Sequence, residues 1–163
     1  MEIRKAKISD MGEIERIYSA AREYMRANGN PTQWGDSYPP KEKITYDIEN
    51  GNLYLVVEDE IPHGVFAYIE WEDPTYKEIY FGEWKNSLPY AVMHRMASDG
   101  KIRGIGRAAL DFCKSKCGNL KADTHKDNKT MQNLLAKNGF QYCGIIHTEN
   151  GSERLAYQYT YFS

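Results

Sequence analysis

The chain has 163 residues, 41% of them hydrophobic, and a formal net charge of −2. This length predicts one domain with a sizeable core, spanning residues 1–163. The charge balance argues against nucleic acid as the main partner. No apolar run approaches the length of a membrane span, and residues 1–4 lack the apolar stretch of a signal peptide, so we expect no membrane partner.

The N-terminal half predicts two helices and three strands. A strand over residues 2–6 precedes a helix, for which Asp10 and Glu13 give the spacing of a capping box. Its apolar stripe consists of Ile14, Ile17, Tyr18, Ala21 and Met25. Glycines and prolines make residues 28–40 an irregular loop, and Pro40 opens a second helix that ends near Gly51. Residues 53–57 and 65–69 are predicted strands, joined by a turn around His63-Gly64.

The C-terminal half alternates strands and helices, after a polar and aromatic segment (72–88) whose form is not predicted. An apolar strand over residues 90–97 leads into a helix with Ile105, Ala109, Phe112 and Cys113 on one face. A strand over residues 120–124 follows, then a helix from Asn128 to a C-cap at Asn138-Gly139. Residues 149–152 form a hairpin turn between a strand over 142–146 and a last strand, in which residues 155, 157, 159 and 161 alternate on one face. These aromatic strands make a homodimer plausible.

The three cysteines indicate neither a disulfide framework nor a metal site. Three thiols cannot all pair. Cys113 and Cys117 lie one helical turn apart, but no second pair of ligands accompanies them, which makes a poor zinc site. We therefore expect free thiols on a helix, no bound metal and a reducing cytoplasm.

The segment Lys101-Ile102-Arg103-Gly104-Ile105-Gly106-Arg107 lies where a strand gives way to a helix. The first N–H groups of a helix lack partners, and the helix dipole adds partial positive charge there. Glycine lets an anion approach those donors because no Cβ intervenes. Arg103 and Arg107 add charge of the right sign. The segment predicts a phosphate-binding turn, with a plain strand-to-helix turn as the alternative.

The same glycines also fit a dinucleotide-binding fingerprint. Gly104-x-Gly106-x-x-Ala109 matches its spacing, and Asp123 lies at a plausible distance for a ribose contact. However, that fingerprint normally occupies the first β-α-β unit, and too little chain remains here for a second nucleotide half. The hairpins before and after it also favour a mixed sheet.

Taken together, these motifs resemble the GNAT superfamily of N-acetyltransferases. Its cofactor motif, Gln/Arg-x-x-Gly-x-Gly/Ala, corresponds to residues 101–106, and its later motif, an Asn followed by a helix ending in Gly-Phe, corresponds to Asn128 and Gly139-Phe140. The opening Ile3-Arg4-Lys5-Ala6, followed by Ser9-Asp10, is also similar. The resemblance covers essentially the whole chain. It implies an α/β (α+β) fold whose central mixed, mostly antiparallel sheet is flanked by helices and splayed where the cofactor enters.

The resemblance implies acetyl transfer from acetyl-CoA, as cosubstrate, to a primary amine of a small molecule or peptide by direct attack. The turn over residues 101–107 would hold the pyrophosphate. Backbone N–H groups at Met96 and Ala97 would polarise the thioester carbonyl. Asn128 caps its helix or contacts the pantetheine arm.

The sequence departs from the family at two positions. Lys101 replaces the usual Gln or Arg, which keeps the charge but loses the guanidinium fork. Leu135 replaces a tyrosine that in many relatives protonates the departing thiolate, so this step has no assigned acid, although a thiol with a pKa of about 8.5 can leave largely as thiolate. Leu135 keeps open the alternative, a GNAT-like module that binds CoA or acyl-CoA as a sensor without turnover.

His94 is the first candidate for the base that deprotonates the amine. It lies two residues before Met96, so the two side chains should share a face of the strand, and histidine ordinarily titrates near neutral pH. Glu70 and Glu83, acting through water, are alternatives. Tyr142 is a candidate replacement proton donor, and His125 could line the cleft.

Trp34 and Tyr38 are the first candidates for the acceptor site. They lie in a Pro- and Gly-rich loop, where large aromatic side chains are costly to expose without a partner, although both could instead pack back onto the sheet. The acidic and aromatic stretches Glu70-Trp71-Glu72-Asp73 and Glu83-Trp84 could form the facing wall. Aromatic faces and carboxylates suit a cationic amine, so we expect a small polar amine or a peptide N-terminus.

Overall fold

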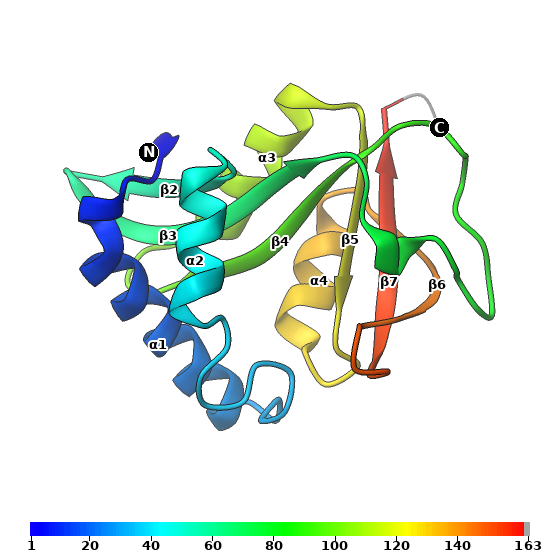
Figure 1. Cartoon of the computed structure of the whole chain (residues 1–163), viewed down its shortest axis with the longest axis horizontal. Helices are drawn as coiled ribbons and strands as arrows, with labels where there is room; N and C mark the ends of the chain where they lie inside the picture. The colour runs from blue at the N-terminus through cyan, green and yellow to red at the C-terminus, as the bar shows by residue number, and fades with distance from the viewer. Residues whose placement is uncertain (162–163) are drawn as a thin grey trace.

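The computed structural model describes residues 1–161, and a mixed sheet of seven strands lies at its centre. The strand order is β1-β2-β3-β4-β5-β7-β6, and every pair is antiparallel except β4–β5. This confirms the predicted fold class (Figure 1). The strands are β1 (Glu2–Lys5), β2 (Leu53–Glu58), β3 (Ile61–Glu70), β4 (Ala91–Ser98), β5 (Asn119–Thr124), β6 (Gln141–His147) and β7 (Glu153–Thr160).

Helices cover both faces of this sheet. They are α1 (Met11–Ala27), α2 (Lys41–Glu49), α3 (Ile105–Lys116) and α4 (Lys129–Lys137). Strand β2 shows why, because its residues 53–57 are all buried but alternate between two clusters: Leu53, Leu55 and Val57 pack with α1 and α2, whereas Tyr54 and Val56 pack with α3. A strand that is buried on both faces reads as a continuous apolar run.

The sheet splits between β4 and β5. These strands pair only at Ala91–Leu120 and Val92–Lys121, while β4 stays paired with β3 as far as Ser98 and β5 stays paired with β7 as far as Thr124. Beyond Val92, therefore, β4 and β5 diverge and leave an opening between the two halves of the sheet (Figure 1). The expected splay is present.

A bulge in β4 changes which side chains share a face. In the register with β3, Val65 faces Ala97 and Ala67 faces His94, so β4 holds one extra residue, and Arg95 has a left-handed φ of 50°. Consequently His94 points towards the β3–β4 connection, while Met96 packs against the α3 side. The expectation that His94 and Met96 share a face is wrong because the bulge interrupts the alternation.

Four other local predictions need correction. The capping box expected of Asp10 and Glu13 does not form, because the Asp10 carboxylate accepts the N–H of Lys7 and does not cap α1, while Glu13 binds Arg16. The β2–β3 turn lies at Asp59–Glu60, both with positive φ, and not at His63-Gly64. Gly64 lies inside β3, where a Cβ would overlap Cγ2 of Ile105, so this glycine serves helix packing. Cys117 is the C-cap of α3 and not a residue within it. Tyr161 lies just beyond β7, so the predicted alternation ends at Tyr159.

The unassigned segment 72–88 forms the β3–β4 connection, which contains the short 3-10 helix η2 (Pro74–Tyr76). Its Tyr76 and Trp84 pack with Val92, Ile146 and Ala156. The connection therefore covers the face of β5, β6 and β7 opposite α3 and α4, which places it beside the opening in the sheet.

Candidate active site

A cavity of about 750 Å³ lies at the opening between β4 and β5. Its walls come from the α1–α2 loop, the β3–β4 connection, the two diverging strands and the β6–β7 turn. Residues that line it include Trp34, Tyr38, Trp71, Asp73, His94, Met96, Thr124, Asn128 and Arg154. Its size and mixed lining are typical of a small-molecule site.

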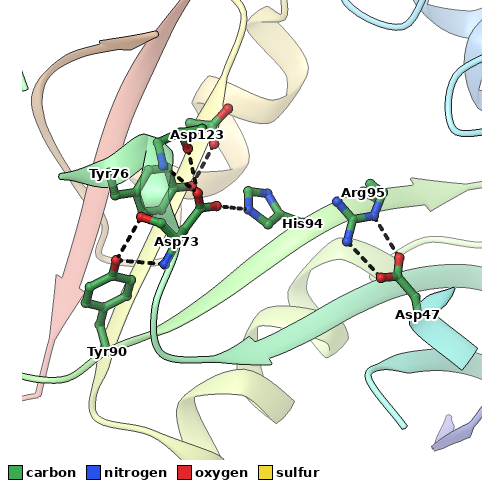
Figure 2. A network of polar contacts seen from close by, with 8 residues as sticks. Asp47, Asp73, Tyr76, Tyr90, His94, Arg95 and Asp123 are labelled. Carbon is green, nitrogen blue, oxygen red and sulfur yellow. Dashed lines mark hydrogen bonds and ion pairs between the residues drawn. The ribbon is translucent and has the colours of Figure 1, made fainter. Parts of the chain in front are cut away.

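His94 and Asp73 form a hydrogen-bonded pair in this cavity (Figure 2). Nε2 of His94 lies 2.7 Å from Oδ2 of Asp73, and Oδ1 of Asp73 accepts hydrogen bonds from the N–H (2.9 Å) and hydroxyl (2.7 Å) of Thr75. Burial alone would raise the pKa of Asp73, but the hydrogen bonds from His94 and Thr75 outweigh it and lower that pKa to about 2.

The charge on Asp73 selects the tautomer of His94. A carboxylate only accepts hydrogen bonds, so Nε2 carries the hydrogen and, in neutral imidazole, Nδ1 holds the lone pair. Within residues 1–161, Nδ1 of His94 has no hydrogen-bond partner, and the side chain lines the cavity. A histidine oriented by a carboxylate, with its other nitrogen free, can act as a general base.

Two tyrosines fasten the β3–β4 connection beside this pair (Figure 2). The Tyr76 hydroxyl donates to Oδ2 of Asp123 on β5 (2.6 Å), and the N–H of Asp73 donates to the Tyr90 hydroxyl (3.1 Å). Burial raises the pKa of Tyr76 well above its ordinary value, so the phenol remains a donor. Asp123 is thus held by a tyrosine of this chain, which gives no support to the dinucleotide alternative.

The bulge at Arg95 is held from two helices. Its guanidinium binds both carboxylate oxygens of Asp47 in α2, at 2.8 and 3.0 Å, and its carbonyl accepts the Tyr18 hydroxyl of α1 at 2.8 Å. The pair is buried. Of the two predicted carbonyl-binding positions next to the bulge, Met96 lines the cavity, whereas the Ala97 side chain is buried under α1 and α2.

The predicted phosphate turn has a structured and open geometry. Gly104 has a φ of 86° and is the N-cap of α3, and within residues 1–161 no side chain caps the first N–H groups of the helix. Asp99 braces the turn, because its carboxylate accepts the N–H of Lys101 (3.0 Å) and binds His63 (2.8 Å) and Arg16 (3.2 Å). Of the turn's residues, Ile105 is buried and Ile102 and Gly106 are partly buried, whereas Lys101, Arg103 and Arg107 are exposed.

The turn before α3 and the hydroxyl of Thr124 suit two polar parts of acetyl-CoA, its pyrophosphate and a polar atom of its pantetheine arm. Open helix N–H groups beside two exposed guanidinium groups suit a pyrophosphate. In the cavity, the hydroxyl of Thr124 is fully buried and has no hydrogen-bond partner within residues 1–161. A buried hydroxyl without a partner is costly, so it suits a polar atom of a ligand. The second glycine, Gly106, has a further role, since a Cβ there would approach Cδ2 of Leu134 in α4 to 2.6 Å.

Asn128 is the predicted cap of α4. Its Oδ1 accepts the N–H of Met131 (3.0 Å), while its Nδ2 donates to Oε1 of Gln33 in the α1–α2 loop (3.1 Å). The side chain also lines the cavity. The contact of Asn128 with a pantetheine arm stays a prediction.

The two loop aromatics predicted for the acceptor site line the cavity and also pack on each other. The rings of Trp34 and Tyr18 lie 5.6 Å apart, and those of Trp34 and Tyr38 lie 6.1 Å apart. The loop therefore lies along the cavity wall and is pinned to α1, whereas its role in binding the acceptor stays a prediction.

The structure does not bring the other predicted site residues to the cavity. Trp84 donates its ring N–H to the carbonyl of Tyr76 and belongs to the cluster beneath the β3–β4 connection. Glu70 and Glu83 are exposed elsewhere. Tyr142 is 52% exposed on β6 and packs against Tyr157. His125 binds the N–H of Asp127 in its own loop.

Sequence reasoning missed Thr124 and Arg154 as cavity residues, and it placed Asp73 in the facing wall without pairing it with His94. Asp73-Pro74-x has the form of an N-cap before a proline, which could have identified η2. Thr124 and Arg154 lie on strands and carried no signal of their own. Within residues 1–161, no cluster of His, Cys, Asp and Glu is suited to a metal ion. Over the same residues, no helix is both long and apolar enough to span a bilayer.

Comparison with known proteins identifies the fold's relatives. No protein-family model and no curated protein matches the chain. Among solved structures, it is similar to a GNAT-family acetyltransferase from Streptococcus agalactiae, with 34% identity, a TM-score of 0.89, and coverage of 98% of this chain and 94% of that one.

Two more distant structures share the fold alone. A ribosomal-protein-alanine N-acetyltransferase from Brucella melitensis is 18% identical, with a TM-score of 0.66 over 98% of this chain and 99% of that one. A candidate acetyltransferase from Salmonella typhimurium, solved with its cofactor acetyl-CoA, is 15% identical, with a TM-score of 0.65 over 98% of this chain and 92% of that one.

Proposed function

The chain belongs to the GNAT family of acetyltransferases, and we propose that it transfers the acetyl group of acetyl-CoA to a primary amine of a small molecule or peptide by direct attack. The observation that carries this proposal is the pairing of His94 with ionised Asp73 in a cavity at the opening of the sheet. Such a pair can remove a proton from an amine held in the cavity.

The base acts before attack, because only a neutral amine is nucleophilic. Nδ1 of His94 takes the proton, and the charge of Asp73 stabilises the imidazolium that results. Bound acetyl-CoA supplies the acetyl group as a thioester, whose carbonyl carbon is open to attack. Backbone N–H groups beside the bulge, at Met96 and Ala97, are the proposed donors to the carbonyl oxygen.

The turn over residues 101–107 is proposed to hold the pyrophosphate, with Arg103 and Arg107 as the charged contacts and the N–H groups of α3 as the neutral ones. Thr124 is proposed as a hydrogen-bond donor or acceptor for the pantetheine arm of acetyl-CoA, which would reach through the opening between β4 and β5. Leu135 is fully buried among the α3 and α4 residues, so we assign no acid at that position. With a thiol pKa of about 8.5, the leaving group needs little help.

Two coarser proposals accompany this one. Strands β1 and β7, from opposite ends of the chain, belong to one sheet, which supports a single domain over residues 1–163. All three cysteines are free, which supports a protein of the reducing cytoplasm. The homodimer stays a prediction.

The test is release of free thiol from acetyl-CoA across a panel of amines, with His94→Ala beside the wild type. We expect turnover to fall by about a hundredfold or more and acetyl-CoA affinity, measured by calorimetry, to stay nearly constant. His125→Ala is the matched control, because His125 lies outside the cavity lining.

Two outcomes would count against the proposal. Full turnover and an unchanged pH profile in His94→Ala would move the base to a carboxylate. Tight binding of acetyl-CoA without thiol release for any amine would favour the alternative, a sensor that binds acyl-CoA.

A further inference from the structure

Arg154 brings a guanidinium to the cavity from the strand opposite His94. It lies near the start of β7, in register with Ile146 of β6, two residues before Ala156, which pairs with Asp123 of β5. Side chains two residues apart on a strand share a face. Arg154 and Asp123 therefore face the same side of the sheet, the side covered by the β3–β4 connection, and Arg154 lines the cavity.

The contacts of Arg154 leave part of its guanidinium unused. Its Nη1 donates to Oγ of Ser152 (2.5 Å) and to the carbonyl of Glu153 (2.9 Å). Within residues 1–161, its Nε and Nη2 have no hydrogen-bond partner, and no carboxylate lies within 4 Å. Arg95, which lines the same cavity, uses its Nε and Nη2 to bind both oxygens of Asp47.

Such a group favours an anionic ligand. Burial lowers the pKa of Arg154, which reflects the cost of keeping its charge partly out of water. The free Nε–Nη2 edge presents two parallel N–H groups, the geometry that matches a carboxylate. A bound carboxylate would offset the desolvation cost and satisfy both donors.

The surroundings also accommodate a cationic amine. Asp123 uses Oδ2 to accept the Tyr76 hydroxyl, and its Oδ1 has no partner within residues 1–161. Asp73 and His94 lie on the neighbouring wall of the cavity. Asp73 is the N-cap of η2, and Tyr76, the last residue of η2, binds Asp123. The cavity thus has an anionic and basic region for an amine beside a cationic group for a carboxylate.

We propose that the acceptor carries a carboxylate next to its amine, as a free amino acid does, with Arg154 binding the carboxylate and the amine facing His94. This inference rests on the proposed function and narrows its acceptor. It also refines the sequence-based expectation of a cationic amine. The ammonium group of an amino acid would still face the acidic residues, while its carboxylate binds Arg154. The aromatic walls at Trp34, Tyr38 and Trp71 would contact the side chain of the acceptor.

The test compares each free amino acid with its amide and with the amine that lacks the carboxyl group altogether. We expect kcat/KM to be about 10- to 100-fold higher for the amino acid, the range for charged hydrogen bonds. Arg154→Gln should remove this preference, mainly through the acceptor KM, and leave acetyl-CoA affinity unchanged. Arg154→Lys should retain part of the preference for the amino acid, and it replaces Arg154→Gln in the test if that variant folds poorly.

Lys43→Gln is the control, because Lys43 is another cation of the cavity and already lies 5.5 Å from the ring centroid of Tyr46. Lys43→Gln should keep the preference for acceptors with a carboxylate. If the preference is lost in Lys43→Gln but kept in Arg154→Gln, the assignment of Arg154 as the carboxylate-binding residue is overturned. Equal rates for amino acids, amides and simple amines in the wild type would also overturn it, while the proposed function would stand.

Calorimetry with free amino acids keeps the two proposals separable. If no amine is acetylated, the proposed function fails, but binding of an amino acid that weakens in Arg154→Gln would still support the carboxylate site. Binding that is absent, or equal in both proteins, would overturn it.

Discussion

A single hydrogen bond decides which nitrogen of His94 can accept a proton. Asp73 holds Nε2, and its charge is secure at neutral pH because its pKa is lowered to about 2. Both oxygens of the Asp73 carboxylate are already bonded, Oδ2 to His94 and Oδ1 to Thr75. Asp73 is therefore a positioning residue, which acts through the ring of His94.

Replacing Asp73 with Asn should lower kcat by about 10- to 100-fold. The amide no longer fixes the tautomer or stabilises the imidazolium. The pH dependence of kcat should change as well, whereas a purely structural role would leave the profile alone. Asp73→Glu should restore part of the rate. Wild-type kinetics and an unchanged pH profile in Asp73→Asn would exclude the positioning role.

The same residue predicts a pH dependence of stability. Because its folded pKa lies below the ordinary value near 3.8, its contribution is present above about pH 4 and is lost as the pH falls towards 2. Urea unfolding of the wild type and of Asp73→Asn should therefore converge over that interval.

At this scale the sequence identified part of the site. His94 reaches the cavity as predicted, but the stated reason, a shared face with Met96, fails because Arg95 forms a bulge. Asp73 was missed as its partner because residues 72–88 show no strand or helix periodicity. That contact is made by the tertiary fold, which brings Asp73 back onto β4 across 21 positions.

Among the elements, the turn between β4 and α3 depends on its two glycines for different reasons. Gly104 adopts a φ of 86°, which side chains disfavour, and Gly106 gives α3 room against Leu134 of α4. Replacing Gly106 with Glu would therefore combine repulsion of phosphate with a packing fault. The exposed arginines offer a cleaner probe of anion binding.

Arg103→Gln/Arg107→Gln should weaken acetyl-CoA binding by about tenfold or more, since even one lost charged hydrogen bond is worth about 1.5–3 kcal/mol, and solvent screens both exposed arginines. Binding of acetyl-pantetheine, which lacks the pyrophosphate, should not change. Among residues 1–161, the contact of the Arg107 guanidinium is a 3.7 Å ion pair with exposed Asp111, so little stability is lost. Calorimetry with both compounds measures the difference.

Lys116→Gln is the matched control for that experiment, because it removes a charge from the opposite end of the same helix. An equal loss in this control, or an equal loss for acetyl-pantetheine, would contradict a specific pyrophosphate site at the start of α3.

The order of elements was largely accessible from sequence, because amphipathic stripes define α1, α3 and α4 and the Asn128 side chain caps α4. The β2–β3 turn was not. Glycine at position 64 signalled a turn, but it is required by the approach of Ile105, a contact between segments some forty residues apart. A local pattern cannot distinguish a packing glycine from a turn glycine.

Across the whole molecule, few strand pairings join the two halves of the sheet. Strands β4 and β5 share only two register pairs. The β3–β4 connection adds Tyr76–Asp123, and the α1–α2 loop adds Gln33–Asn128. The resemblance to the family predicted this opening, whereas the composition and periodicity of the chain contain nothing that would. The cavity lies between the halves, so its walls combine segments from both.

The α1–α2 loop spans from one half to the other, and its aromatic residues should affect the acceptor and not the cosubstrate. Tyr38 is 37% exposed and lines the cavity, while Trp34 also packs on Tyr18. Tyr38→Ala should raise the acceptor KM by about tenfold, the loss of about 1.4 kcal/mol of contact, and leave the acetyl-CoA KM unchanged. Trp34→Ala should raise the acceptor KM and also lower the melting temperature, because it removes packing against α1.

Trp34→Phe separates these two effects. It keeps an aromatic ring against Tyr18 and should restore most of the thermal stability, while the smaller ring still changes the cavity wall. If Tyr38→Ala and Trp34→Ala lose only thermal stability, and acceptor kinetics are intact in both, the loop is a structural brace and the acceptor does not bind against it. An increase in the acetyl-CoA KM would instead place the cosubstrate on the side of the opening assigned here to the amine.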